Sequence, residues 1–538
     1  MERRQFLRNT ALATAVPLLA ANTASGALHP QEASTLDCDT FVYGSTPGGL
    51  AAAIEAARRD CRVLLACPKV NPGGMTASGL CTTDAVRREL FGGLVLEFIE
   101  GVRKEYLREL GETSPDWPLI RDGWFYEPSV AERVFERMLE AEAEQLTFLR
   151  GHHLLSATTD ESRVTEAVLE NPQGKPIRIT ARTFIDGTYE GDLAAAAGVS
   201  YRVGREGRDE HGESLAGIHY MDWKKGEQII TPDTGEPSPA IQAFCARSIF
   251  TDDPEKRVPL EKPETYEQHL PDLLPLLSDF ESGRVKRCTL GSKLARRKYQ
   301  LNGSIVRMTS VNLPGVSWTW PDADRHHRAR LEQFHIDHAA SYAWFLQNDP
   351  RVPADIRGLW KNAGRHIDEF PDNHHWPWQI YVRQGRRIDG RARVTQHHFI
   401  VDEKTGRTPT VDQPIAIGEH SFDVHPCHDR RFAVDGWMEG VLWYPKKASG
   451  PAQPGQVPYG AMLPEKLNNL LVPVALSSTH IAMSVLRMEP LWMTTGQVAG
   501  LASAVAKDSG IDAANLDPDP LPKTLQIKID PYETVEKP

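Results

Sequence analysis

A glycine-rich turn close to the start of the chain has the residue types that bind phosphate. Gly44 and Gly49 match the first and third glycines of the pattern G-x-G-x-x-G, and Thr46 stands in place of the second. The backbone N–H groups of such a turn and the positive end of the next helix favour a pyrophosphate. A Cβ there would block either the phosphate or the contact between helix and strand. The turn, with Pro47 and Gly48 inside it, therefore indicates dinucleotide binding.

The segments around this turn predict a strand–helix–strand unit. We expect strands at 41–43 and 63–66 and an alanine-rich helix at 50–58. Two parallel strands need a crossover of this kind. The acid that usually binds the ribose about 20 residues further on is missing, because Cys67 ends the second strand. An ordinary unit of a cofactor-free sheet is the alternative interpretation.

A second glycine-rich loop follows that strand, and it reads Asn-Pro-Gly-Gly-Met-Thr-Ala-Ser-Gly over residues 71–79. Together with residues 43–54, it resembles the FAD-dependent oxidoreductase family, whose members open with a Tyr-Gly-x-Thr-Pro-x-Gly turn. The resemblance implies an FAD cofactor and makes the threonine of the turn a family trait. Cys67 departs from the family pattern, because relatives usually carry Glu there. The cofactor-binding candidates in the second loop are Gly73, Gly74 and Met75.

The same resemblance implies that residues 184–198 and 487–506 approach the flavin. The first segment runs from a buried strand through a turn into an alanine-rich helix, with Asp186 and Thr188 as candidate ligands. Acids that merely cap a helix are the alternative there. The second segment predicts a helix whose N-terminus, near 494–497, would stabilise the negative charge that grows at N1 and the C2 carbonyl of the flavin. Its candidate ligands are Thr495, Gly496 and Gln497, and Gly496 and Gly500 would allow close packing.

Histidine is the natural choice of general base near neutral pH, and the chain has 19 of them. His425 and His480 lie in segments similar to those of the family, and we favour His425 slightly. Arg383 and Glu489 are weaker candidates, which would orient an anionic or polar substrate. Any single histidine is more often structural. Adjacent histidines on a strand point to opposite faces, so we predict no metal site in the pairs at 374–375 and 397–398.

The central region is rich in tryptophan, and indole rings can stack on sugars or other flat ligands. Packing within a loop-rich domain is the expected role for most of these side chains. Residues 373–387 resemble a family stretch at a domain junction, which implies that one or two of its polar side chains lie near the flavin. The six tryptophans are Trp318, Trp320, Trp344, Trp360, Trp376 and Trp378.

The N-terminal residues have the pattern of a targeting signal. Arg3 and Arg4 are followed by Gln-Phe-Leu, then by an apolar segment at 11–21 and small residues at 24–27. This resembles a twin-arginine export signal; a disordered or amphipathic tail is the alternative. That route carries folded proteins with bound cofactors, so we predict the twin-arginine translocase as a partner and a periplasmic or secreted location. The seven scattered cysteines contain no C-x-x-C pair, which argues against an iron–sulfur cluster, and folding in a reducing compartment argues against disulfides.

A chain of 538 residues exceeds one compact core, so more than one domain is expected. The predicted fold is α/β: a Rossmann-like FAD-binding domain of the glutathione-reductase type with an inserted α+β substrate domain. The net charge of −11 argues against nucleic-acid binding. No apolar run is long enough to predict stable membrane insertion. The predicted ranges are 1–27 for the signal peptide, 28–36 for a linker, 37–204 and 425–510 for the FAD-binding domain, 205–424 for the insertion and 511–538 for a peripheral arm.

Further helices and strands are predicted from the periodicity of apolar residues. We expect helices at 82–106 and 325–348 and one that begins near Pro128, with strands at 146–150, 154–158, 164–170, 177–185 and 470–474. The function predicted from all of these features is that of an exported FAD-dependent oxidoreductase. It would act on a small organic or carbohydrate-like substrate and pass electrons to an unknown acceptor. The alternative is a non-redox lyase or ligand-binding protein on a flavoprotein fold.

Overall fold

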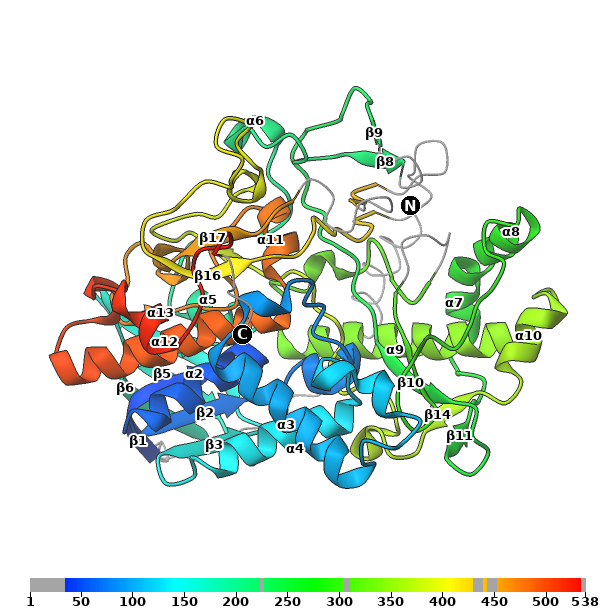
Figure 1. Cartoon of the computed structure of the whole chain (residues 1–538), viewed down its shortest axis with the longest axis horizontal. Coiled ribbons are helices and arrows are strands. Elements are labelled where there is room, and N and C mark those ends of the chain that lie inside the picture. Colours follow the sequence, from blue (N-terminus) through cyan, green and yellow to red (C-terminus); the bar gives the residue numbers. More distant parts are fainter. Residues whose placement is uncertain (1–33, 223–226, 304–309, 429–438, 443–451, 534–538) are drawn as a thin grey trace, which may run out of the picture. The chain divides into compact units, whose positions relative to one another are not determined.

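The computed structural model describes residues 34–222, 227–303, 310–428, 439–442 and 452–533 (Figure 1). Its largest sheet has seven strands in the order β3-β2-β1-β6-β5-β4, and β18 pairs with β6. The predicted signal peptide and most of the predicted linker lie outside the described residues. The strands are β1 (Ser34–Tyr43), β2 (Val63–Cys67), β3 (Leu146–Arg150), β4 (His153–Asp160), β5 (Arg163–Glu170), β6 (Pro176–Asp186) and β18 (Leu470–Leu471).

The sheet has a parallel part and an antiparallel part. β1 pairs parallel with β2, with Tyr43 opposite Ala66, and β2 pairs parallel with β3. β18 is parallel to β6, whereas β4, β5 and β6 are joined antiparallel. Successive residues of a strand face opposite sides, so Val42 joins one apolar core while Phe41 joins the other. Both faces of β1 are therefore covered, which explains why its last residues are a continuous apolar run.

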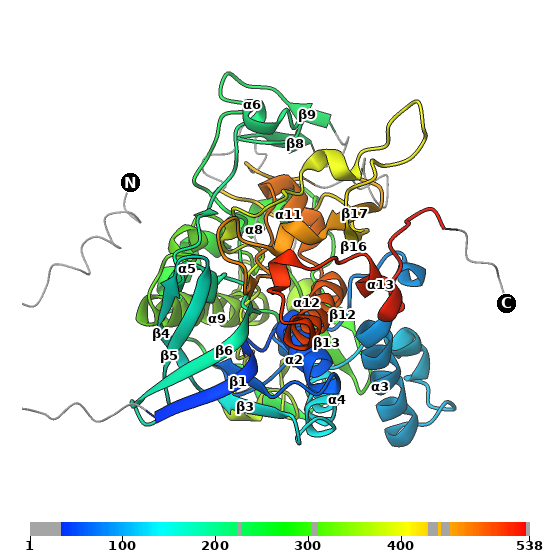
Figure 2. The ribbon, with the colours of Figure 1, turned by 90° about the vertical axis from the view of Figure 1, so that its left-hand side faces the viewer.

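Four helices pack beside the parallel strands: α2 (Pro47–Arg58), α3 (Gly93–Glu109), α4 (Pro128–Glu140) and α12 (Glu489–Ser509). α2 makes the crossover from β1 to β2, and Figure 2 shows α12 end-on beside it. A Cβ on Gly496 would lie 2.0 Å from the carbonyl oxygen of Gly48, and one on Gly500 would lie 2.3 Å from that of Ala52. The predicted close packing at these two glycines is thereby confirmed.

A second sheet is antiparallel, with the order β11-β14-β10-β13-β12. In Figure 1 it lies with α7, α8 and α10 on the opposite side of the molecule from β1 and β6. Buried apolar side chains form one continuous core from α2 and α12 to β10. The elements are β10 (Ser248–Thr251), β11 (Arg257–Pro259), β12 (Ser292–Lys293), β13 (Lys298–Leu301), β14 (Gly364–His366), α7 (Tyr266–Leu273), α8 (Pro275–Glu281), α9 (Arg325–Asn348) and α10 (Ala354–Trp360).

Shorter elements connect these parts. Two-stranded pairs are formed by β7 with β15, by β8 with β9 and by β16 with β17. They are β7 (Tyr201–Arg202), β8 (Tyr220–Asp222), β9 (Glu227–Ile229), β15 (Arg387–Ile388), β16 (Pro414–Gly418) and β17 (Gly455–Pro458), and the remaining α-helices are α5 (Asp192–Ala196), α6 (Arg208–His211), α11 (His480–Leu486) and α13 (Pro520–Thr524). No helix among the described residues is long and apolar enough to cross a membrane.

Most predicted elements are confirmed, and the errors have local causes. α9 has the predicted bounds, because Asp324 caps it by accepting the N–H of His327 at 2.7 Å. The helix predicted at 82–106 begins only at Gly93, because the hydroxyls of Thr82 and Thr83 bind the backbone of the next residues in turns. The strand predicted at 470–474 covers two residues. β1 begins at Ser34, so it includes the last three residues of the predicted linker.

Candidate functional site

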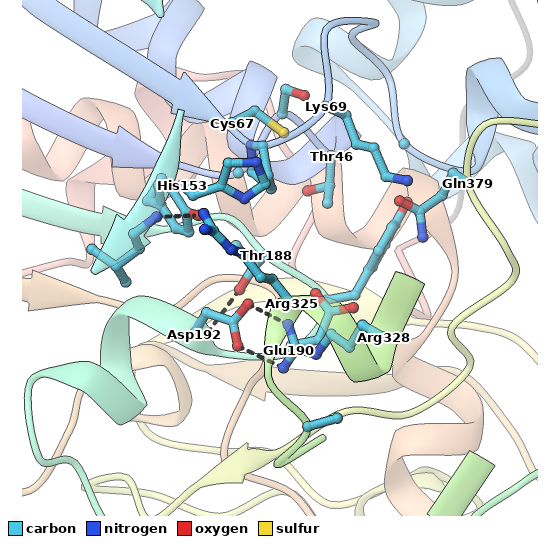
Figure 3. A pocket seen from close by; sticks show the side chains of 18 of the residues that line it. Thr46, Cys67, Lys69, His153, Thr188, Glu190, Asp192, Arg325, Arg328 and Gln379 are labelled. Carbon is cyan, nitrogen blue, oxygen red and sulfur yellow. Dashed lines mark hydrogen bonds and ion pairs between the residues drawn. The ribbon is translucent and has the colours of Figure 1, made fainter. Parts of the chain in front are cut away.

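A cavity of about 570 Å³ lies at the carboxyl ends of β1 and β2 (Figure 3). Ligands of doubly wound sheets bind at this edge, and the volume lies within the range of small-molecule pockets. The lining has three sources. The glycine turn and β2 with its following loop supply Tyr43, Gly44, Ser45, Thr46, Cys67, Pro68, Lys69 and Gly74; β4 supplies His153, Leu154 and Leu155, and the turn after β6 with α5 supplies Thr188, Tyr189, Glu190, Asp192 and Ala196. The central region supplies Trp320, Ala323, Asp324, Arg325, Arg328, Ala329, Glu332, Trp378, Gln379 and Arg386.

The glycine turn is closed by threonine. Thr46 caps α2 by accepting the N–H of Gly49 at 3.2 Å, and its hydroxyl donates to the carbonyl of Gly187 at 2.6 Å. Gly44 has φ +106°, and a Cβ on Gly49 would lie 1.9 Å from the Gly44 carbonyl oxygen. Ser45 and Thr46 line the cavity, and their backbone N–H groups have no acceptor among the described residues. Free N–H groups at a helix N-terminus fit a pyrophosphate.

The other three predicted residues of this turn, Pro47, Gly48 and Gly49, do not line the cavity. Pro47 and Gly48 form the first turn of α2, and Gly48 packs against α12, where a Cβ would lie 2.9 Å from the carbonyl oxygen of Trp492. In the second loop Gly74 lines the cavity, but Gly73 packs against Phe135. Thus the glycines divide into those that approach the cavity and those that let neighbouring elements pack closely.

The turn after β6 is organised by Asp186. This fully buried carboxylate accepts the N–H of Thr188 at 3.0 Å, its hydroxyl at 2.6 Å and the N–H of Ala194 at 2.8 Å. Burial raises the pKa of Asp186 to about 6. Asp186 therefore fits the alternative role of a capping acid, whereas Thr188 lines the cavity.

A charged network holds α9 across this cavity. Arg328 donates to both oxygens of Asp192 at 2.6 and 2.9 Å, and Arg386 donates to one of them at 2.9 Å (Figure 3). Burial alone would raise the pKa of Asp192, but Arg328 and Arg386 hold it below its usual value. Lys69 binds Glu332 of α9 at 2.8 Å, and Arg325 of α9 binds Glu170. Each of the four cations that line the cavity thus has a carboxylate partner.

The lining of the cavity shows which carboxylates lie near the position after β2 where the sequence lacks the usual ribose-binding acid. Cys67 lines the cavity as a buried thiol. The carboxylates of the lining come instead from Glu190, Asp192, Asp324 and Glu332, far along the chain. Sequence spacing could not find them, because α9 and the turn after β6 meet β2 only in the folded protein.

A buried hydrogen-bond chain leads away from Gly74. The hydroxyl of Tyr189 accepts the N–H of Met75 at 2.9 Å and donates to Glu489 at 2.7 Å. Burial raises the pKa of Glu489 to about 8, so this carboxyl is protonated at neutral pH. Its second oxygen has no hydrogen-bond partner among the described residues. A Cβ on Gly74 would lie 2.4 Å from the Tyr189 hydroxyl, which explains the glycine.

The predicted helix N-terminus at 494–497 is wrong. α12 begins at Glu489, with Pro490 in the first turn, where its fixed φ and missing N–H are tolerated. Residues 495–497 lie in the second and third turns of the helix and are absent from the cavity lining. Thr495 donates to the carbonyl of Pro473 at 2.8 Å, Gly496 contacts Gly48, and Gln497 donates to Glu55 at 2.9 Å. All three residues attach α12 to its neighbours.

Two of the three predicted catalytic side chains come together outside the cavity. His425 is buried, and Arg383, Arg487 and Arg247 all act electrostatically on it. Burial, reinforced by these arginines, lowers the pKa of His425 well below its usual value. Its Nδ1 lies 3.0 Å from Nδ2 of Asn312.

His480 lies elsewhere. Its Nδ1 is 2.8 Å from Oε1 of Gln384, and its backbone N–H donates to Glu206 at 2.9 Å. Burial, then Arg205 and Arg387, lower the pKa of His480. This pattern is that of a structural histidine at the start of α11.

The tryptophans fall into two groups, those that line the cavity and those that pack within the protein. Trp320 and Trp378 line the cavity, whereas Trp360 and Trp376 pack edge-on against Phe250 at centroid distances of 5.6 and 6.3 Å. From the stretch 373–387, the polar residues Gln379 and Arg386 also reach the cavity. In the described part of the chain, no group of three or more His, Cys, Asp or Glu side chains is placed to hold a metal ion.

Comparisons with known proteins show the family of the chain. The family model "FAD dependent oxidoreductase" matches residues 39–527. No curated protein matches the chain. Similar solved structures include L-proline dehydrogenase from P. horikoshii (14% identity, 34% of this chain and 26% of that one, TM-score 0.20) and the myxobacterial chondrochloren halogenase CndH (17%, 41% and 45%, 0.24). A third is p-nitrophenol 4-monooxygenase PnpA from Pseudomonas putida DLL-E4 (12%, 36% and 49%, 0.22).

The chain matches less than half the length of each of these three structures. The family match covers most of the chain and includes every element that lines the cavity. The protein therefore belongs to the FAD-dependent oxidoreductase family.

Proposed function

We propose that the protein is exported in its folded state and oxidises a small organic substrate, carbohydrate-like molecules included. A bound flavin would supply the redox chemistry as acceptor of the hydride of a substrate C–H bond, and a base of this chain would take the proton of the adjacent hydroxyl or amine. The electrons then leave to an acceptor such as a quinone, a carrier protein or oxygen. The family match supports the cofactor and the reaction class. The proposal adds that the enzyme oxidises its substrate and that a side chain of the protein acts as the base.

The cavity residues would hold the nucleotide part of the cofactor. The free N–H groups of Ser45 and Thr46 suit the pyrophosphate. Arg328 and Arg386 also line the cavity, and Asp192 fixes the direction of both guanidinium groups. Trp320 and Trp378 offer flat apolar faces. Because these side chains are already bonded to one another, little reorganisation would accompany binding.

The proposed base is His425, and its position is the observation that carries this choice: it is buried beside Arg383, Arg487 and Arg247, and its Nε2 lies 3.8 Å from Oδ2 of Asp423. Burial and three arginines keep the imidazole neutral at pH 7, so a ring nitrogen is able to accept a proton. The amide of Asn312 at 3.0 Å orients the ring. Protonated Glu489 and Tyr189 contribute hydrogen bonds without adding a negative charge near Met75.

An anaerobic reduction test addresses this proposal. The purified protein should show the visible absorption of bound flavin, and one class of compound in a screen of sugars, alcohols, amines and hydroxy acids should bleach it. His425→Gln should slow that bleaching about 10²–10⁴-fold, the usual contribution of a general base. His480→Gln is the matched control, because it is also a buried histidine, and its rate should stay within about tenfold. Bound flavin that no compound reduces would instead favour a non-redox role.

Export needs its own test. Replacement of Arg3 and Arg4 by lysine should leave the flavin-containing protein in the cytoplasm, while the unaltered chain reaches the periplasm or medium. Equal distribution of both forms between cell fractions would contradict the export proposal.

A further inference from the structure

Three buried arginines surround one tyrosine ring just beyond the cavity. The guanidinium carbons of Arg383, Arg247 and Arg487 lie 4.5, 4.8 and 5.7 Å from the ring centroid of Tyr381. None of the three side chains is more than slightly exposed, and Arg383 is fully buried. We call these four residues the arginine cluster.

The arginine cluster has too little negative charge around it. Arg487 binds Asp423 at 2.9 Å. In the described part of the chain, neither Arg383 nor Arg247 has a carboxylate at ion-pair distance: Arg383 donates to the Ala243 carbonyl and the Cys245 sulfur, and Arg247 donates to the Leu80 carbonyl.

Two further carboxyl groups face the cluster. Asp84 is half-buried and acts electrostatically on Arg487 and Tyr381. Glu489 is protonated at neutral pH, because burial raises its pKa to about 8. His425 is neutral there as well. Three cations therefore face two anions, and a buried excess cation is costly unless a counterion joins it.

The cluster is continuous with the flavin site. Trp378 and Gln379 line the cavity, and the chain then runs directly to Tyr381 and Arg383. Ser78, in the second glycine-rich loop, accepts the N–H of Gln379 at 3.0 Å. A Cβ on Gly79 of the same loop would lie 2.3 Å from the Arg247 carbonyl oxygen. The loop that ends the cavity therefore packs directly on the cluster.

We propose that the arginine cluster binds a carboxylate group of the substrate, so that the enzyme oxidises a small organic acid. This inference rests on the proposed oxidoreductase function and narrows its substrate class. A guanidinium group matches a carboxylate with two parallel hydrogen bonds. Arg383 and Arg247 supply the uncompensated charge, and His425 lies beside them to take the proton from a neighbouring hydroxyl or amine.

The first test is ligand binding to the FAD-loaded protein. Malonate and acetate should produce a saturable change in the flavin spectrum and raise Tm, because a ligand that binds only the folded state stabilises it. The uncharged amides malonamide and acetamide should do neither. A response to phosphate equal to that of malonate would overturn the assignment to carboxylates, as would the absence of any response to either acid.

Two variants separate a binding role from a structural one. Arg383→Gln should weaken malonate binding at least tenfold while leaving the ligand-free Tm unchanged or higher, because it removes a buried charge that lacks a counterion. Arg387→Gln is the matched control: Arg387 is also buried, but it binds Glu206 at 2.8 Å. It should lower Tm and leave malonate affinity unchanged. If Arg383→Gln lowers Tm as much as Arg387→Gln and binds malonate normally, the inference is wrong.

Arg247→Gln provides a second variant should Arg383→Gln not fold, and the same tenfold loss of malonate affinity is expected from it. Flavin content and flavin reduction distinguish a failure of the proposed oxidoreductase function from a failure of the carboxylate site. Protein without flavin would contradict the proposed function, whereas a flavin that neutral alcohols bleach and acids leave untouched would contradict the carboxylate site alone.

Discussion

The cavity and the arginine cluster differ in how their charges are balanced. In the cavity Arg328 and Arg386 share Asp192, and Lys69 binds Glu332. In the cluster, Arg383 and Arg247 have no such partner among the described residues. The cavity side chains remain partly open to water, whereas Arg383 is wholly buried. The charge that is easier to solvate is thus the one that is paired.

This difference teaches what each region is built to do. Paired charges hold their geometry without a ligand, which suits a site for a cofactor that stays bound. An unpaired buried charge raises the free energy of the ligand-free state, and a ligand that neutralises it recovers that energy on binding. The cluster therefore suits a substrate that comes and goes.

The largest expected effect concerns the glycine turn beside the cavity. Gly49→Val would place a Cβ 1.9 Å from the Gly44 carbonyl oxygen, a collision with backbone that no rotamer relieves. We expect a loss of about 3 kcal/mol or more of unfolding free energy and no retained flavin. Gly358→Ala is the control, because its Cβ would meet nothing within 4 Å, and it should stabilise α10 slightly. Urea unfolding and flavin content measure both, and a Gly49→Val protein that keeps its flavin would contradict the assignment.

The second prediction concerns Glu489, which links the two regions through Tyr189. Its pKa is raised to about 8, so the unfolded chain loses this proton at lower pH than the folded protein. The stabilisation is full below the unfolded pKa of about 4.5 and is lost as pH rises to 8, at about 1.4 kcal/mol per pH unit. Glu489→Gln removes this dependence. The Tm of the variant minus that of the wild type should therefore rise from pH 4.5 to 8 and then level off, and a constant difference would contradict it.

The sequence predicted the fold well wherever the signal was local. The glycine turn, α9 and strands β3 to β6 follow from turn chemistry, capping and apolar periodicity over short windows. The start of α3 was missed because Thr82 and Thr83 form local turns that compete with the helix. The N-terminus of α12 was misplaced although Pro490, a typical first-turn residue, marks it.

The site was predicted only in part, because its charges come from distant elements. Gly44, Thr46, Cys67, Gly74 and Thr188 were found from the turns and line the cavity. The cations of α9 carry no local mark of a ligand site, since an arginine on a helix surface is usually solvated. The arginine cluster is similar: its members lie in three segments of the chain, and only the fold shows that the three guanidinium groups lie against the ring of Tyr381.

The third prediction concerns Asp423, whose replacement would leave the arginine cluster with still less negative charge. Asp423→Asn removes the carboxylate that binds Arg487, whose side chain is 2% exposed. Removal of one member of a buried pair leaves an uncompensated charge; because Asp423 is 22% exposed, we expect a loss of about 2 kcal/mol. Malonate should restore part of this stability and bind more tightly than to the wild type. Urea unfolding with and without malonate measures both effects, and malonate binding that weakens would place the ligand outside the cluster.

The smallest effect is expected from the paired network of the cavity. Asp192→Asn leaves Arg328 and Arg386 without their shared partner, but all three side chains are 10–25% exposed, so water takes over part of the interaction. We expect a loss of about 1 kcal/mol of unfolding free energy and a weaker hold on FAD, because the two guanidinium groups lose their fixed direction. Asp322→Asn is the control, since Asp322 also binds Arg386 but is 58% exposed, and it should change stability by less than about 0.5 kcal/mol. Increased stability in Asp192→Asn would mean that the cavity, like the cluster, carries charge in excess of its needs, and the contrast between the two regions would fail.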